Sequence, residues 1–160
     1  MTPYERVRKS RELTAATFPL PTVLDCVRYA ITELAEYDDA LLRQERTGDK
    51  RNNDKAHDPR NELGQALYML LSAAVQLKCD CDVSPYSAND RFAAYVDSVR
   101  GLASCAYYGN GRAIGALMWH VDDAYAVLCS LAAANGWSVD ALIDDTCAAF
   151  EAKHAPQEAR

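Results

Sequence analysis

Apolar residues recur at the spacing of α-helices along most of this 160-residue chain, and no pair of segments alternates as two paired strands would. The clearest case lies between residues 22 and 45, where Val23, Val27, Ile31 and Leu34 fall on one face of a helix. A face of this kind is stable only when it is buried against other helices. The sequence therefore predicts an all-α fold, a helical bundle of about five helices.

Polar and glycine-containing segments divide the chain between these helices. Asp58 followed by Pro59 is typical of a helix start, and Asn135 followed by Gly136 is typical of a helix end. We expect a single domain over residues 1–160, in which residues 1–17 are an N-terminal extension. The predicted helices cover approximately residues 22–45, 59–78, 90–106, 112–134 and 138–153.

Charge and hydropathy exclude several classes of protein. The formal net charge of −6 argues against a protein that binds the phosphates of nucleic acid. The apolar stretches are interrupted before the ~18 residues that a membrane span needs, and residues 1–17 lack the apolar run of a signal peptide. We expect a cytoplasmic protein that binds neither nucleic acid nor membrane.

The cysteines are predicted to be reduced side chains of the core, since most of them fall in apolar helical patterns. A zinc site on Cys79 and Cys81, completed by Cys105 or His120, is the weaker alternative because this spacing fits no standard zinc knuckle. The six cysteines are Cys26, Cys79, Cys81, Cys105, Cys129 and Cys147.

Carboxylates interrupt the apolar faces of two predicted helices. Glu33 and Glu36 lie one turn apart on the same side of the first helix, in a row that is otherwise small or apolar. Glu62 begins a largely apolar row on the next helix. Like charges on buried faces repel one another and lose hydration unless a cation lies between them. Oxygen ligands of this kind suit a hard divalent cation, whereas the alternative is a pair of solvated helix faces.

The segments around these glutamates resemble one known family. ITELAEYDDALL followed by NELGQALYMLLSAA is similar to the MazG-like all-α nucleoside triphosphate pyrophosphatases, which include dimeric dUTPases and phosphoribosyl-ATP pyrophosphatases. The resemblance covers about residues 18–78, and the segment from Leu131 to Pro156 resembles the closing helix of that family. It implies a MazG/dimeric-dUTPase-like bundle that holds Mg²⁺, or Mn²⁺, on ExxE and ExxD motifs.

The resemblance also implies roles for individual residues. Glu33, Glu36 and Glu62 would be metal ligands and catalytic residues, while Gln65 stands where the family has an aspartate. Aligning Gln65–Ala66 with Asp123–Ala124 brings two similar helical segments together, so Asp123 is the candidate for the missing carboxylate. Alternatively, Gln65 offers its amide oxygen to the cation and the cluster functions with one fewer charge. A third alternative is a decayed site, in which the protein binds nucleotide without turnover.

Substrate contacts are expected from basic residues near the predicted metal site. Lys50, Arg51 and Lys55 lie in the polar loop between the two glutamate-bearing helices, where they would contact phosphates with Gln65. A solvated loop with scattered charge is the alternative. Lys153 is a further candidate, because the family often carries a lysine on its closing helix.

The implied reaction is Mg²⁺-dependent cleavage of a (d)NTP to the (d)NMP and pyrophosphate. A phage enzyme of the MazZ type, which prefers dGTP or GTP, is one version of this expectation. A catalytically weakened nucleotide-binding or regulatory protein of the same fold is the alternative. The family commonly forms dimers or tetramers, so we expect a homodimer or homotetramer.

Overall fold

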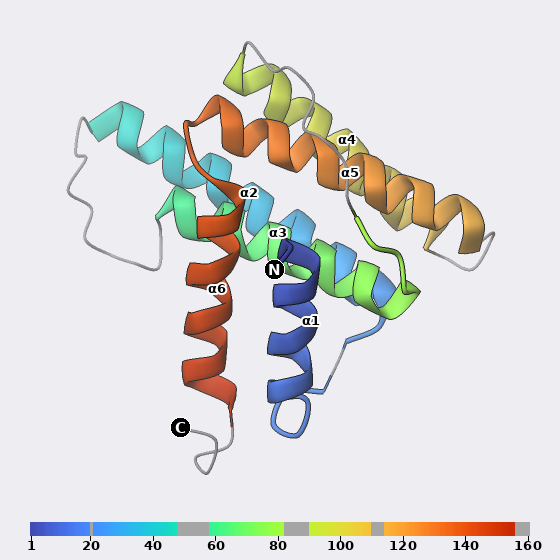
Figure 1. The fold of residues 1–160 in the computed structure, drawn as a ribbon. Coiled ribbons are helices and arrows are strands. Elements are labelled where there is room, and N and C mark those ends of the chain that lie inside the picture. The colour runs from blue at the N-terminus through green and yellow to red at the C-terminus, as the bar shows by residue number, and fades with distance from the viewer. Residues whose placement is uncertain (20, 48–57, 82–89, 110–113, 156–160) are drawn as a thin grey trace.

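The computed structural model describes residues 1–19, 21–47, 58–81, 90–109 and 114–155. These residues contain six α-helices and no strand, which confirms the all-α prediction (Figure 1). The helices are α1 (Pro3–Thr14), α2 (Val23–Thr47), α3 (Pro59–Leu77), α4 (Arg91–Tyr108), α5 (Ile114–Ala134) and α6 (Val139–His154).

Five of these helices begin and end within a few residues of the predicted bounds, and their capping residues explain why. The side chain of Asp58 accepts a hydrogen bond from the backbone of Arg60 at the start of α3. Ser138 accepts one from the backbone of Ala141 at the start of α6. Gly136 has a positive φ of 72°, as a left-handed helix end requires.

Helix α1 was not predicted, since the sequence indicated only an N-terminal extension over residues 1–17. Thr2 and Glu5 form a capping box, in which each side chain binds the backbone N–H of the other residue. Pro3 lies in the first turn, where its missing N–H costs nothing. The residues that α1 buries include the polar Ser10 and Arg11, so the apolar periodicity that reveals the other helices is absent here.

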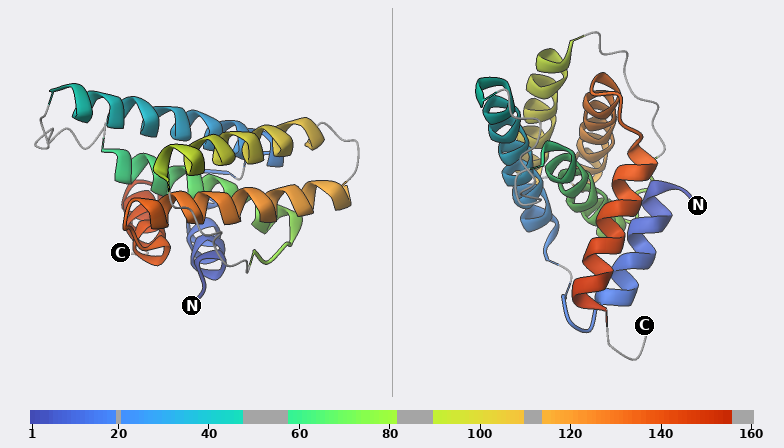
Figure 2. Two further views of the ribbon diagram at one scale, coloured as in Figure 1. Left: turned by 90° about the horizontal axis from the view of Figure 1, so that it is seen from above. Right: turned by 90° about the vertical axis from the view of Figure 1, so that its left-hand side faces the viewer.

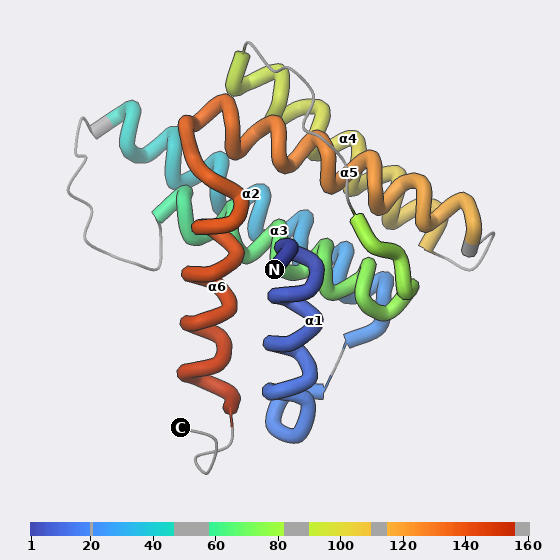
Figure 3. The backbone as a smooth tube through the Cα atoms, viewed as in Figure 1, coloured from blue at the N-terminus to red at the C-terminus, as the bar shows by residue number. Residues whose placement is uncertain are grey.

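The helices form two antiparallel pairs and a third pair that crosses them. Helix α2 packs on α3 and α4 packs on α5, while α1 lies beside α6 (Figures 1 and 2). Helix α3 contacts α1, α2, α5 and α6, and its buried residues extend from Pro59 to Ala74. The smooth trace in Figure 3 shows α1 and α6 running across the direction of α3. Helix α3 is therefore the central element of the core.

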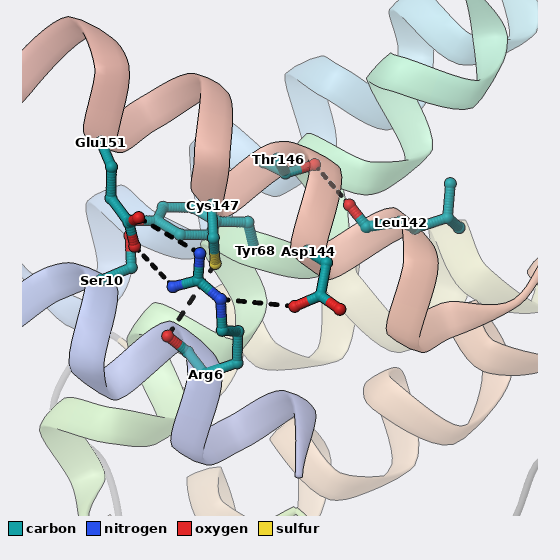
Figure 4. Close-up of polar contacts among 8 residues, drawn as sticks. All are labelled: Arg6, Ser10, Tyr68, Leu142, Asp144, Thr146, Cys147 and Glu151. Carbon is teal, nitrogen blue, oxygen red and sulfur yellow. Dashed lines mark hydrogen bonds and ion pairs between the residues drawn. The ribbon is translucent and has the colours of Figure 1, made fainter. Parts of the chain in front are cut away.

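An ion pair holds α1 against α6. The Arg6 guanidinium donates two hydrogen bonds to the Glu151 carboxylate, at 2.5 and 3.2 Å, and contacts Asp144 at 3.3 Å (Figure 4). The Cys147 thiol donates to the backbone carbonyl of Arg6 at 3.9 Å. A bidentate arginine–carboxylate pair fixes both distance and orientation, so α1 sets the position of α6.

Among the described residues, no single helix has the length and hydropathy of a membrane span. Gly115–Ala134 and Val139–His154 pass that test only as a pair, and the pair is bent by 102°.

Helices α3 and α6 approach closely at Gly64. A Cβ atom at Gly64 would lie 2.5 Å from Thr146 Oγ1 and 3.3 Å from the carbonyl oxygen of Leu142. The Thr146 hydroxyl already donates to that same carbonyl at 2.8 Å (Figure 4). No larger residue fits there unless α6 shifts or Thr146 gives up its hydrogen bond.

Replacing Gly64 by Ala should therefore destabilise the protein by about 1–3 kcal/mol, as overpacking of a core does. The matched control is Gly115→Ala in α5, where a Cβ would meet nothing within 4 Å. This control should be neutral or stabilising by up to about 1 kcal/mol, because alanine favours helix. Urea unfolding of both variants measures the difference, and equal midpoints would contradict the close approach.

Candidate metal centre and adjoining cavity

Three glutamates predicted to be metal ligands come together in the structure. Carboxylate oxygens of Glu33 and Glu36 in α2 and of Glu62 in α3 all lie within 4.8 Å of one another. The helical spacing of three residues places Glu33 and Glu36 on the side of α2 that faces α3. Asp58, which caps α3, places Glu62 in the first turn of that helix. The structure thus brings the three predicted ligands together.

The burial of the three carboxylates differs, and Glu62 is the most enclosed. The Glu62 side chain is 2% exposed, Glu33 is half-buried and Glu36 is exposed. Burial raises the pKa of Glu62 to about 8, helped by its hydrogen bond to Glu33 and by the negative charges of Glu33 and Glu36. Burial also raises the pKa of Glu33. In the described part of the chain, no lysine or arginine forms an ion pair with any of the three glutamates.

This donor set fits a hard divalent cation. Three carboxylates so close together cannot all be ionised without a positive charge among them, and here the missing charge is supplied by a proton on Glu62. Mg²⁺ and Mn²⁺ prefer oxygen ligands and would replace that proton. The electrostatics of the cluster therefore match those of a metal-binding site.

Gln65 and Asp123, the two candidates for the fourth ligand, have different positions. The Gln65 amide donates to Glu62 Oε2 at 3.2 Å, so this side chain borders the cluster. Asp123 does not belong to the group of carboxylates that the structure brings within 4.8 Å, and it lies beside Cys105 of α4 instead. The prediction that Asp123 completes the cluster thus finds no support, because Asp123 is exposed on α5, a helix that does not pack on α2 in the described part of the chain.

A cavity of about 470 Å³ lies next to the glutamates, between α2, α3 and α6. Its size falls within the range of small-molecule sites. Glu33, Gln65 and Lys153 line it, so three residues predicted for metal or substrate binding share one cavity. Aromatic rings supply much of the remaining wall, and they belong to Phe18, Tyr29, Tyr68, Phe150 and His154.

The aromatic residues nearest the base of this cavity pack on one another. The ring centroids of Phe18 and Phe150 are 5.0 Å apart, those of Phe150 and His154 are 4.6 Å apart, and those of Tyr68 and Phe150 are 5.0 Å apart. Thr17 also donates a hydrogen bond to the backbone carbonyl of His154. The segment after α1 is thus fixed against the end of α6, where it closes one side of the cavity.

Arg11 is a buried cation behind this aromatic wall, and the sequence did not single it out. Its side chain is 3% exposed, and its guanidinium carbon lies 5.2–5.5 Å from the ring centroids of Phe18, Tyr68 and Phe150. Arg11 Nε donates to Ser72 Oγ at 2.9 Å, whereas both terminal nitrogens lack a hydrogen-bond partner among the described residues. Three aromatic faces stabilise the charge in place of water.

Three of the predicted phosphate contacts, Lys50, Arg51 and Lys55, lie outside the described residues. Lys153 is described and lines the cavity from α6.

All six cysteines are free and buried, as predicted for reduced core side chains.

Comparisons with models of known protein families, with curated proteins and with solved structures give no match to this chain. The site itself is therefore the basis for proposing a function.

The raised pKa of Glu62 predicts how stability depends on pH in metal-free protein. Between pH 4.5 and about 8, the folded protein retains a proton that the unfolded chain has released. The free energy of unfolding should therefore fall as pH rises through this window, by a few kcal/mol, since one pKa unit corresponds to about 1.4 kcal/mol.

Glu62→Gln removes this titrating group, so the free energy of unfolding of the variant should fall much less as pH rises. At the alkaline end of the window, the variant should be more stable than the wild type. Urea unfolding in the presence of a chelator, at a series of pH values, compares the two proteins. Glu12→Gln, in an exposed residue of α1, is the control that should follow the wild type. Parallel curves for wild type and Glu62→Gln would show that the Glu62 pKa is not raised.

Proposed function

We propose that this protein is a Mg²⁺-dependent nucleoside triphosphate pyrophosphohydrolase, which cleaves a (d)NTP to the (d)NMP and pyrophosphate. The observation that carries the proposal is the convergence of Glu33, Glu36 and Glu62 beside an aromatic cavity that also holds a lysine. A nucleoside triphosphate needs both features, a divalent cation for its phosphates and a flat apolar surface for its base.

In this proposal, Glu33, Glu36 and Glu62 hold the metal. When bound, Mg²⁺ would neutralise phosphate charge and increase the acidity of water. Glu62 would give up its proton when it holds the metal, and Glu36, the exposed member of the three, would be the group open to accept a proton from water. The Gln65 amide, bound to Glu62 Oε2, keeps that carboxylate in position.

The cavity supports the same substrate class. Lys153 and Glu33 line the same cavity, so Lys153 would contact the phosphates of a nucleotide bound there, and the rings of Phe18, Phe150 and His154 would stack on the base. The volume of about 470 Å³ lies within the range of small-molecule sites, which supports a free nucleotide as the substrate.

One observation favours the alternative, a protein of this fold that binds nucleotide with little or no turnover. Gln65 occupies the position of an expected aspartate and donates its amide N–H to Glu62, so the cluster has three carboxylates in place of four. A site with one fewer negative charge binds Mg²⁺ less tightly. Measured turnover separates the two functions.

Incubation with Mg²⁺ and each of eight NTPs and dNTPs should release pyrophosphate from at least one nucleotide. The same panel tests the expected preference for dGTP or GTP. Glu36→Gln and Glu62→Gln should each lower kcat at least about 100-fold, because each removes a ligand of the metal.

Asp39→Asn is the matched control on α2, an exposed aspartate paired with Arg43 at 2.5 Å, and it should retain the wild-type rate. Full activity in either glutamate variant would refute the assignment of the metal site. No pyrophosphate from any nucleotide, together with a Mg²⁺-dependent rise in Tm, would instead indicate a binding protein or a substrate outside the panel.

Lys153 should act on substrate binding more than on the chemical step. Removing its charge in Lys153→Met should raise KM about tenfold, because a hydrogen bond to a charged group contributes about 1.5–3 kcal/mol. Lys9→Met is the control, since Lys9 lies on α1 away from this cavity. Steady-state kinetics with the preferred nucleotide measure both variants, and an unchanged KM in Lys153→Met would exclude the contact.

We also propose that the protein assembles as a homodimer or homotetramer. Helix α4 exposes Phe92, Val96 and Val99, which lie on one face at spacings of four and three residues. Their exposed fractions of 70%, 47% and 41% are high for an apolar row, and a second copy of the chain would cover it.

A further inference from the structure

A second group of metal-ligating side chains lies away from the glutamates. Cys79 and Cys81 follow the end of α3, Asp122 lies in α5, and their ligand atoms are all within 4.8 Å of one another. The Cys79 thiol donates to Asp122 Oδ1 at 3.5 Å. The two cysteines are 7% and 5% exposed, and Asp122 is half-buried. The group is thus enclosed by the protein.

The end of α3 builds this arrangement. Lys78 takes a left-handed conformation with φ of 54° and ends the helix, and the backbone N–H of Cys79 still bonds to the carbonyl of Ala74 at 3.0 Å. Asp80 is exposed between the two buried cysteines. Both thiols therefore point inward, toward the middle of α5, which the segment after α3 approaches in Figure 1.

The spacing of the donor atoms suits zinc. In a tetrahedral site with Zn–S of about 2.3 Å and Zn–O of about 2.0 Å, a sulfur and an oxygen ligand are about 3.5 Å apart. The Cys79 Sγ and Asp122 Oδ1 atoms already have this separation. Two sulfurs and one oxygen are soft enough to prefer Zn²⁺ to Mg²⁺. Two buried thiols beside a carboxylate therefore form three-quarters of a zinc coordination sphere.

We propose that Cys79, Cys81 and Asp122 bind a Zn²⁺ ion, with water as the fourth ligand. Binding forms two Zn–S bonds and one Zn–O bond to Asp122, the ion keeps one of its water ligands and releases the others, and the two thiol protons leave to solvent. No oxidant or reductant takes part. The ion ties the C-terminal end of α3 to α5, and this proposal does not depend on the proposed pyrophosphatase activity.

Neither partner expected from the sequence is the third ligand. Cys105 lies beside Asp123 on the α4–α5 contact, and the His120 ring stacks on Tyr108 with centroids 4.2 Å apart. Neither joins the group formed by Cys79 and Cys81 among the described residues. Asp122 was not predicted, because a carboxylate in place of a third cysteine or histidine matches no common sequence motif.

Titration with Co²⁺ tests the proposal in the intact, reduced protein. Cobalt takes the place of zinc and gives a thiolate-to-metal absorption band, which carboxylate ligands alone do not produce, so the glutamate cluster does not contribute to it. We expect this band to saturate at an equimolar amount of Co²⁺ and to disappear when Zn²⁺ is added. Absence of the band in reduced wild-type protein would overturn the proposal.

Three variants identify the ligands. Cys79→Ser and Cys81→Ser should lose the band or shift it to that of a single thiolate, and Asp122→Asn should require more Co²⁺ to saturate. Cys105→Ser and Asp123→Asn are the matched controls, a neighbouring thiol and carboxylate outside the group, and should titrate as wild type. A wild-type band in Cys79→Ser or Cys81→Ser would overturn the assignment.

A second measurement needs no variant and so does not depend on whether the variants fold. In wild-type protein, Zn²⁺ should slow alkylation of Cys79 and Cys81 at least tenfold without changing that of Cys105, as quantified by mass spectrometry of the peptides. Equal rates with and without Zn²⁺, or a disulfide between Cys79 and Cys81 that forms regardless of Zn²⁺, would also overturn the proposal.

Discussion

The burial of one carboxyl group, that of Glu62, is the constraint on which the site depends. Helix α3 is surrounded by four other helices, so a charged residue on it has little access to water. Glu62 lies in the first turn, where free backbone N–H groups and the helix dipole favour negative charge, although only by about 1 kcal/mol. The raised pKa shows that this is insufficient with Glu33 and Glu36 so near. The cluster therefore carries either a proton or a cation, and the exchange of one for the other is the basis of metal binding.

The cavity depends on interactions made far from the glutamates. Arg6 holds α6 to α1 through Glu151, and Gly64 lets α6 approach α3 as far as Thr146. Arg11 supports the aromatic wall from behind, with its charge facing three rings and one hydroxyl. These contacts help to shape the cavity of about 470 Å³ that Glu33, Phe150 and Lys153 line. The packing of α1, α3 and α6 thus sets the shape of the cavity, whereas the three glutamates beside it come from α2 and α3.

The sequence predicted the features that depend on the period of a single helix and missed those that depend on packing between helices. The helical spacing of Glu33 and Glu36 and the capped start of α3 were predicted because each is local to one helix, whereas the expectation that the three glutamates converge rested on both segments together and on their resemblance to a known family. Helix α1 was missed because it buries Ser10 and Arg11, and polar residues leave no apolar stripe. Asp123 was predicted to supply the missing carboxylate because two helical segments have similar sequences. Such a similarity does not show which neighbouring helix each residue faces. Asp122, the neighbour of Asp123 and about 100° away around α5, instead meets the end of α3.

The two groups of ligands lie near opposite ends of α3. Their donor atoms differ, so each group favours a different metal ion. Seventeen residues separate Glu62 from Cys79, which corresponds to roughly 25 Å along a helix. At this distance two unit charges interact by less than about 1 kcal/mol at an effective dielectric constant of about 20, so charge at one group has little effect on the other. Three carboxylates favour a hard cation, whereas two thiols and one carboxylate favour zinc. Loading one group should therefore leave metal affinity at the other unchanged, unless the packing of α3 itself transmits the effect.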